Sequence, residues 1–170
     1  MDRCTVSNAF LCRHSMFGGL ADGQLETIRP YLKEDSYEKG TVILHQGEPN
    51  NTVYFIVSGD VAIQKHPDDS ENGERDITTL HEGDSFGEME LIDIQPCAAS
   101  AVCLTDVQVI SLSNRDLYQL SKTHLSIYTM IIMNLARDIS RRLRKTDNLL
   151  ALVTKNGKRI TTKGENHGTS

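Results

Sequence analysis

Short aliphatic and β-branched runs alternate with turn residues from residue 39 to residue 112. The runs are TVIL, TVYFIV, DVAIQ, DITTL, AASAVCL and DVQVISL, and stretches such as QGEPNN and HEGD separate them. Many short strands separated by polar, glycine-containing turns are typical of an antiparallel sandwich or barrel. The pattern therefore predicts a mainly β domain, folded as a roll of two strand layers.

A helical pattern precedes these strands. Leu25, Ile28 and Leu32 recur at helical spacing. Asp22 is in position to be the N-cap, and Pro30 should bend or shorten the helix near its end. The sequence predicts one short helix before the β region.

Two further helices are predicted after the strands. Ser113 and Asp116 have the spacing of a capping box, with Asp in place of the usual Glu, and begin a short helix that ends near Lys122. A helix of about 40 Å then spans residues 125–153. Positions at alternating spacings of four and three along it are apolar, except for Arg142 and Thr146 in the middle, which predicts a homodimer seam that ends at Val153. The seam residues are Tyr128, Ile132, Leu135, Ile139 and Leu149. The alternative is a helix packed wholly on its own domain.

Charge and hydropathy exclude several classes of protein. The 170 residues carry a net charge of −5 at a pI of about 5.6, so no broad basic field attracts nucleic acid. The basic run RRLRK (141–145) is interpreted as a solvated helix face. No apolar run approaches the ~20 residues of a membrane span, and the N-terminus is too polar for a secretory signal. We expect a cytoplasmic protein without a membrane partner.

The cysteines and histidines do not form a recognisable site. Cys4, Cys12, Cys97 and Cys103 include no CxxC pair and are expected to be free thiols. A metal or iron–sulfur site that uses N-terminal cysteines and one later cysteine is the alternative. The histidines are scattered, and no P-loop, HExxH, GxSxG or dinucleotide fingerprint occurs. We expect no enzymatic activity.

The stretch FGEMELIDIQPCAASAV (86–102) carries the strongest candidate chemistry. Gly87 follows a strand-like run and precedes a possible single helical turn, so the backbone there can approach a ligand and offer N–H groups to an anion. Glu88 would repel a phosphate unless it accepts hydrogen bonds from sugar hydroxyls. The Gly–Glu pair therefore suits a ligand with both phosphate and ribose, although an ordinary turn is the commoner explanation.

The order of the elements and two motifs closely resemble the cyclic nucleotide-binding domain. The motifs are QGEPNNTVYFIVSGDVAI (46–63) and EGDSFGEMELIDIQPCAASAV (82–102), and the resemblance covers roughly residues 17–152. That domain serves the catabolite activator family of bacterial regulators, protein kinase A regulatory subunits and some ion channels. The resemblance implies a β-roll (a double-stranded jelly roll), a phosphate-binding cassette at 86–102 and a helical lid.

The resemblance also implies how the chain is organised. We expect an N-terminal extension (1–16), a β-roll effector domain (17–124), a long dimer helix (125–153) and a polar tail (154–170). Only 17 residues follow Val153 (170 − 153), which are too few for a helix-turn-helix, so this chain alone is expected not to read DNA. Its protein partner is unknown.

Site roles follow from the resemblance, residue by residue. Gly87 and Met89 would offer backbone contacts around the cyclic phosphate and sugar, and Glu88 would bind the ribose 2′-hydroxyl. Ala98 would donate a backbone N–H to the phosphate, and Phe86 would pack beneath the cassette. The implied ligand-binding set is Phe86, Gly87, Glu88, Met89, Cys97, Ala98 and Ala99.

Two departures from the family pattern put the ligand in question. The phosphate-binding arginine of the family falls at Cys97, which offers neither a fixed charge nor a bidentate fork. Glu90 replaces a residue that is usually small. Arg75 and His81 would substitute for the arginine only if the fold brings them to the pocket.

We expect a regulatory module that couples occupancy of the β-roll to a helical lid and a dimer helix, with weakened or altered binding of cyclic AMP or cyclic GMP. Another small ligand, neutral or differently charged, would be an altered occupant of the same cavity. The alternatives are a non-sensing interaction module with a degenerate pocket, and a thiol, metal or redox sensor. In that sensor Cys97, at a helix N-terminus, would have a lowered pKa and act with the N-terminal cysteines.

Overall fold

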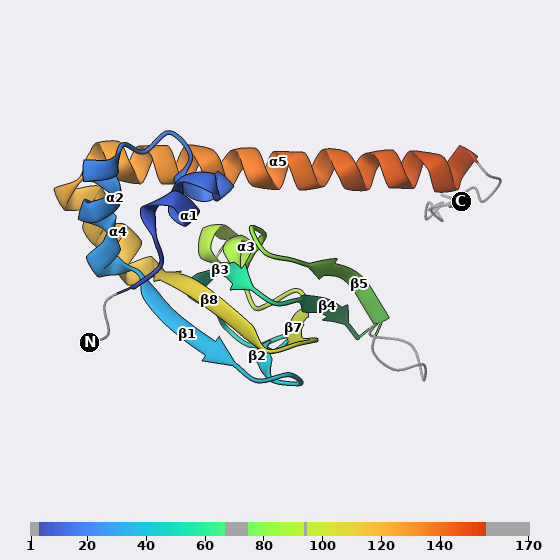
Figure 1. Cartoon of the computed structure of the whole chain (residues 1–170). Helices are drawn as coiled ribbons and strands as arrows, with labels where there is room; N and C mark the ends of the chain where they lie inside the picture. The colour runs from blue at the N-terminus through green and yellow to red at the C-terminus, as the bar shows by residue number, and fades with distance from the viewer. Residues whose placement is uncertain (1–3, 67–74, 94, 156–170) are drawn as a thin grey trace, which may run out of the picture. The chain divides into compact units, whose positions relative to one another are not determined.

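The computed structural model of the protein describes residues 4–66, 75–93 and 95–155 (Figure 1). The contacts between residues divide the chain into two compact units, Met1–Leu135 and Ala136–Ser170. All described strands lie in the first unit, and the last helix, α5 (Leu125–Lys155), crosses the boundary between the two. The predicted polar tail, apart from its first two residues, lies outside the described part of the chain.

Within the described residues, eight strands form two antiparallel four-stranded sheets, which confirms the predicted β-roll (Figure 1). The first sheet has the order β1 (Lys33–Tyr37), β8 (Val107–Ser113), β3 (Thr52–Ser58), β6 (Ser85–Phe86). The second has the order β2 (Val42–Leu44), β7 (Ser100–Cys103), β4 (Val61–Lys65), β5 (Arg75–Leu80). The six predicted runs correspond to β2, β3, β4, β5, β7 and β8.

Two strands were not predicted. β1 has the sequence KEDSY, which lacks the aliphatic alternation of the other strands, and among the described strands it pairs with β8 alone, at an edge of its sheet. β6 is two residues long and pairs with β3 at Tyr54↔Phe86 and Phe55↔Ser85. Short or polar edge strands carry too little hydrophobic pattern to be recognised in a sequence.

One buried apolar cluster joins the two sheets. The first sheet contributes Ile56, Val107 and Val109, and the second contributes Val61 and Ala101, all at most 2% exposed. These residues alternate along their strands with residues that face the other way, as the period of two requires. The cluster is the core of the roll and supports the 86–102 cassette.

The predicted N-terminal extension packs against the opposite face of the first sheet. It contains α1 (Asn8–Arg13) and the 3₁₀ turn η1 (Ser15–Phe17). The ring of Phe17 meets that of Phe55, on β3, edge to face at 5.2 Å between centroids. Leu11 and Met16 are also buried. These residues therefore belong to the core of the first unit.

The short helices follow the predicted boundaries closely. α2 (Asp22–Ile28) gives way to a 3₁₀ turn, η2 (Arg29–Tyr31), at Pro30, as expected. Its N-cap is Ala21 and not Asp22, because the side chain of Gln24 accepts the hydrogen bond of the Ala21 N–H at 3.0 Å and fixes the start one residue earlier.

The predicted N-cap of the next helix, Ser113, is confirmed, but Asp116 bonds to the Ser113 side chain and not to its backbone. Ser113 caps α4 (Asn114–Thr123), its Oγ accepting from the Asp116 N–H at 3.1 Å. The Ser113 hydroxyl also donates to the Asp116 carboxylate at 2.5 Å. The shorter Asp side chain thus pairs with the capping hydroxyl, where a capping-box Glu reaches back to the backbone.

The beginning of α5 is held in the core of the first unit. Ile127, Ile131 and Leu135 recur every four residues and are at most 3% exposed. Asn134 is also buried, and its amide donates to the carbonyl oxygens of Met16 and Gly18, each at 2.9 Å. Leu135, predicted in the dimer seam, is therefore occupied by the chain's own core.

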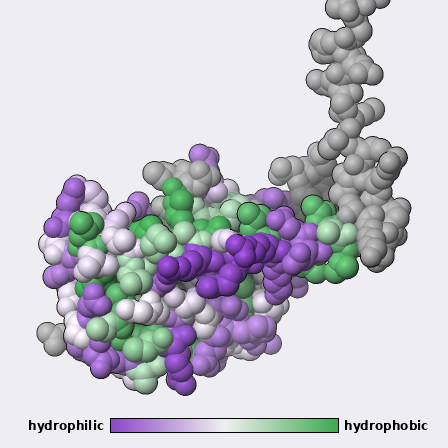
Figure 2. Space-filling view, turned by 90° about the horizontal axis from the view of Figure 1, so that it is seen from above, coloured by the Kyte–Doolittle hydropathy of each residue, from purple (hydrophilic) through white to green (hydrophobic). Residues whose placement is uncertain are grey.

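The rest of α5, in the second unit, buries little of its side chains. Arg141 and Arg142 form ion pairs with Asp138 at 2.9 and 3.3 Å. Figure 2 shows hydrophobic side chains gathered near the end of the described part of this helix. The large exposed apolar residues there are Leu143, Leu149, Leu150 and Leu152, each at least 50% exposed.

Candidate functional site

The cassette begins where β6 ends and turns sharply at Gly87. Its φ of +79° lies in the left-handed region that favours glycine. A Cβ added there would lie 2.6 Å from the Thr52 carbonyl oxygen and 2.9 Å from the Asn50 Nδ2. The backbone of β3 therefore sets the position of the turn, and α3 (Glu88–Asp93) follows it as the predicted single helical turn.

Asn50 orders the side of the turn that faces β3, a role that the sequence did not reveal. Its Nδ2 donates to the Thr52 carbonyl at 2.7 Å, and its Oδ1 accepts from the Thr52 N–H at 3.1 Å. The same Nδ2 lies 3.4 Å from the Gly87 carbonyl. One side chain thus joins the β2–β3 connection to the start of the cassette.

Phe86 is buried and supports the cassette from below. It is 3% exposed, and its ring stacks on Tyr54 of β3 at 5.0 Å and 10°. Burial, followed by the negative charge of Asp35, raises the pKa of Tyr54. The Tyr54 hydroxyl is therefore neutral at physiological pH.

Glu88 and Met89 point into different surroundings. The Glu88 side chain is 3% exposed, whereas Met89 is 58% exposed. A buried carboxylate next to a close backbone turn has the chemistry to accept hydrogen bonds from ribose hydroxyls. The side chain of Glu90 lies outside the described part of the structure.

Cys97 stands in a loop and its side chain lies in the core of the roll. It is 3% exposed and belongs to the apolar cluster between the sheets. Its N–H donates to the Glu48 carbonyl and its carbonyl accepts from the Gly47 N–H, both at 2.8 Å. The expected position at a helix N-terminus is wrong, because α3 ends at Asp93 and β7 begins at Ser100. Ala98 is exposed and Ala99 half-buried beyond it.

No cation takes the place of the missing arginine among the cassette residues. The sequence contains no lysine or arginine between Arg75 and Arg115. His81 is 64% exposed at its side chain, and its Nδ1 lies 2.7 Å from an Asp60 carboxylate oxygen. The Arg75 side chain lies outside the described part. Within the cassette sequence, 86–102, Glu88 offers hydrogen-bond acceptors and no lysine or arginine is present.

Two of the other thiols, Cys4 and Cys103, are buried and poorly suited to redox or metal chemistry, whereas Cys12 is exposed. Burial raises the pKa of Cys4 and of Cys103, which keeps both protonated at neutral pH. Within the described residues, no group of three histidine, cysteine, aspartate or glutamate side chains is placed to hold a metal ion. No helix in the same residues is long and apolar enough to cross a membrane.

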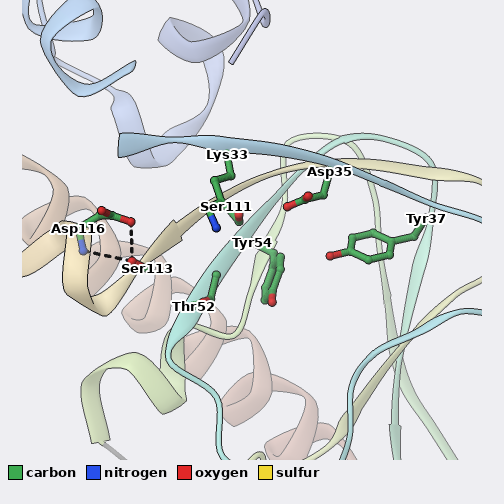
Figure 3. Close-up of a pocket in the computed structure, with 8 residues that line it drawn as sticks. All are labelled: Lys33, Asp35, Tyr37, Thr52, Tyr54, Ser111, Ser113 and Asp116. Carbon is green, nitrogen blue, oxygen red and sulfur yellow. Dashed lines mark hydrogen bonds between the residues drawn. The ribbon is translucent and has the colours of Figure 1, made fainter. Parts of the chain in front are cut away.

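A polar cavity of about 150 Å³ lies on the first sheet, beside Tyr54 (Figure 3). Its walls come from β1, β3, β8 and α4, and the sequence did not predict it because β1 was not recognised. Strand alternation puts Ile56 and Val109 on the same face as Tyr54 and Ser111, so the cavity continues the roll core with polar residues. The lining residues are Lys33, Asp35, Tyr37, Thr52, Tyr54, Ser111, Ser113 and Asp116.

Comparison with known proteins gives consistent matches. The cyclic nucleotide-binding domain family matches residues 34–124. The CRP-like cAMP-activated global transcriptional regulator of Mycobacterium tuberculosis is 30% identical over 83% of this chain and 60% of its own length. The cyclic AMP receptor protein of Thermus thermophilus is 30% identical over 82% of this chain and 62% of its own. The chain thus spans about 60% of the length of these relatives.

Solved structures share the fold. A cyclic nucleotide-binding domain from Methylobacillus flagellatus has a TM-score of 0.77 at 22% identity, over 90% of this chain and 84% of that one. The regulatory subunit of a cAMP-independent protein kinase A from Trypanosoma brucei has a TM-score of 0.64 at 25% identity, over 76% and 44%. That structure is a triple mutant bound to cAMP in the A site, and one of its substitutions replaces a threonine with an arginine.

Proposed function

The chain belongs to the cyclic nucleotide-binding domain family, and from this premise we propose that it is a non-enzymatic regulatory module whose cassette binds cyclic AMP and cyclic GMP poorly. The observation that carries the proposal is Cys97, a buried neutral side chain where the family resemblance puts a phosphate-binding arginine. A charge-assisted hydrogen bond contributes about 1.5–3 kcal/mol, so its loss lowers affinity by about one to two decades.

The negative charges around the cassette should weaken the binding of a phosphate further. Glu88 is buried in the cassette, and the stretch from Asp76 to Asn114 contains acidic residues but no lysine or arginine. The trypanosome kinase subunit offers a parallel, since it is described as cAMP-independent and its arginine-bearing mutant is bound to cAMP. A ligand with the ribose of a nucleotide but a smaller negative charge suits the wild-type cassette better.

The test is calorimetric titration of the wild type and Cys97→Arg with cyclic AMP and cyclic GMP. We expect no submicromolar binding by the wild type and an affinity about 10- to 100-fold higher in the variant. Cys97→Ser is the matched control, because it changes the polarity of the side chain without adding a charge. Its affinity should stay that of the wild type.

Two outcomes would contradict the proposal. A submicromolar dissociation constant for the wild type would mean that another group supplies the missing charge. A folded Cys97→Arg variant, verified by circular dichroism, that gains no affinity would mean that charge at this position does not limit binding. The wild-type titration decides the first point even where the variant fails to fold.

We also infer that the module is a cytoplasmic homodimer that transmits occupancy of the roll through α5. Support comes from the α5 seam, where Tyr128, Ile132 and Ile139 are half-buried and Leu149 is 56% exposed. The second candidate, a non-sensing assembly module, is favoured by the burial of Cys97 in the apolar core. A ligand-dependent rise in melting temperature separates the two, because only a sensing module binds a ligand preferentially in its folded state.

A further inference from the structure

The cavity on the first sheet is lined by the hydroxyl of a largely buried serine, Ser111, which is open to the cavity. Ser111 is 5% exposed and lines the cavity, and among the described residues its side chain makes no hydrogen bond (Figure 3). Buried polar side chains normally have a partner, so an unpaired one facing a cavity points to a ligand or ordered water. None of the cassette residues lines this cavity, and the inference is independent of the function proposed above.

Two opposite charges stand beside this hydroxyl on β1. Lys33 and Asp35 are two residues apart on the same side of the strand, and both line the cavity. In the described part of the chain neither forms an ion pair. Both residues are exposed as well as lining the cavity, so a ligand can reach their charges from solvent. Charges on an edge strand also prevent edge-to-edge pairing, but that role does not account for the Ser111 hydroxyl beside them.

The charges select the class of ligand. An anion would meet the ammonium of Lys33 but also the carboxylates of Asp35 and Asp116, and a cation would meet Lys33. A neutral polyol would leave both charges of β1 without a partner. A molecule with one positive and one negative group satisfies both at once.

The dimensions of the cavity limit the size of that molecule. Side chains two residues apart on a strand are separated by about 6.7 Å, which an ammonium and a carboxylate attached to one carbon bridge with a hydrogen bond of ~2.8 Å at each end. A cavity near 150 Å³ has room for a ligand of about six to nine heavy atoms. We propose that this cavity is a binding site for a small zwitterion, the size and charge pattern of a free α-amino acid.

The two tyrosines supply the remaining contacts. Tyr37 and Tyr54 both line the cavity, and their rings offer apolar surface to the carbon atoms of such a ligand (Figure 3). Burial raises the pKa of Tyr37 to about 12, so its hydroxyl remains a hydrogen-bond donor at neutral pH. Tyr54 also stacks on Phe86, so a ligand here touches the support of the cassette.

The test is an NMR titration of the protein with alanine, beside three molecules of similar size that change its charge: propionate, ethylammonium and propionamide. We expect alanine to cause saturable shifts of β1, β3 and β8 amide resonances, and each analogue to bind about tenfold more weakly or worse. Equal binding of any analogue would overturn the charge pairing. A specific site of this kind should have a dissociation constant well below about 50 mM. Absence of saturable shifts at that concentration of alanine would therefore overturn the proposed site.

Substitutions of residues that line the cavity test whether alanine binds there. Ser111→Ala and Asp35→Asn should each weaken alanine binding by about three- to tenfold, since each removes one hydrogen-bonding or ionic partner. Asp147→Asn, an exposed residue of α5 with the same change of charge as Asp35→Asn, should leave it unchanged. Wild-type affinity in folded Ser111→Ala and Asp35→Asn would overturn the assignment, and the ligand series decides it independently of any variant.

Discussion

Gly87 occupies a position where both conformation and space exclude a side chain. Gly87→Ala would strain the φ of +79° and drive a Cβ against the Thr52 carbonyl, so we expect a loss of about 2–4 kcal/mol in the free energy of unfolding. Gly40→Ala is the matched control, because Gly40 has a φ of +86° but nothing within 4 Å of its added Cβ. That change should cost only about 1 kcal/mol in urea denaturation. Equal losses for the two would show that the contact with β3 is unimportant.

Titration of the Tyr37 hydroxyl makes the free energy of unfolding depend on pH in the alkaline range. Burial, with a smaller contribution from Asp35, raises its pKa from 10.0 to about 12. Between these values the unfolded chain releases the phenol proton while the folded chain retains it, so the free energy of unfolding falls as the pH rises. Tyr37→Phe should flatten this part of the stability profile, measured by urea denaturation between about pH 9 and 11. Tyr118→Phe, at a side chain 62% exposed, should not.

Single residues were predicted best where their chemistry is local. Gly87 and Ser113 have roles that depend on neighbours in sequence, and the structure confirms the turn and the cap. The burial of Cys97 depends on strands distant in sequence, so its loop position and apolar surroundings were not predictable from spacing. Its effect on ligand binding remains a prediction.

At the scale of elements, Asn134 joins α5 to the N-terminal segment. Asn134→Ala would leave the Met16 and Gly18 carbonyls without this donor, and we expect a loss of about 2 kcal/mol in the free energy of unfolding. Hydrogen exchange should also become faster in residues 15–18. Asn148→Ala, at an exposed position of the same helix, should change stability by less than about 0.5 kcal/mol. A similar effect of both variants would contradict a specific role for Asn134.

The cavity was not predicted because the polar strand that lines it, β1, was not predicted. β1 places Lys33 and Asp35 where other strands place aliphatic residues, because its inner face lines a polar cavity. The aliphatic strands were predictable from periodicity alone. Element-level patterns thus identified the roll core but missed the cavity whose polar lining breaks the pattern.

At the scale of the whole molecule, we expect a dimer of about twice 19.0 kDa by light scattering. Leu149→Lys places a charge in the proposed seam and should raise the dimer dissociation constant by at least about tenfold. Leu104→Lys, at a side chain 38% exposed outside α5, should leave the dimer intact. A wild-type mass of 19.0 kDa at micromolar concentration would contradict the dimer.

The first compact unit includes residues that were predicted from the sequence to belong to other parts of the chain. Residues 4–16 were expected to form an extension, yet Cys4, Leu11 and His14 are buried. The first compact unit continues to Leu135, beyond the predicted limit of 124, because Ile127 and Ile131 supply core side chains. A helical seam of period 3.5 and a core-facing stripe share residues, so the sequence alone does not separate them.

A single base substitution can convert the Cys97 codon to an arginine codon, and the backbone contacts at this position do not oppose the change. The hydrogen bonds of Cys97 to the Glu48 carbonyl and from the Gly47 N–H join main-chain atoms and do not depend on the side chain. Both cysteine codons become arginine codons when their first base changes from T to C. A cassette with its phosphate-binding charge is therefore one point mutation away, and random mutagenesis with selection for a cyclic AMP response should recover it.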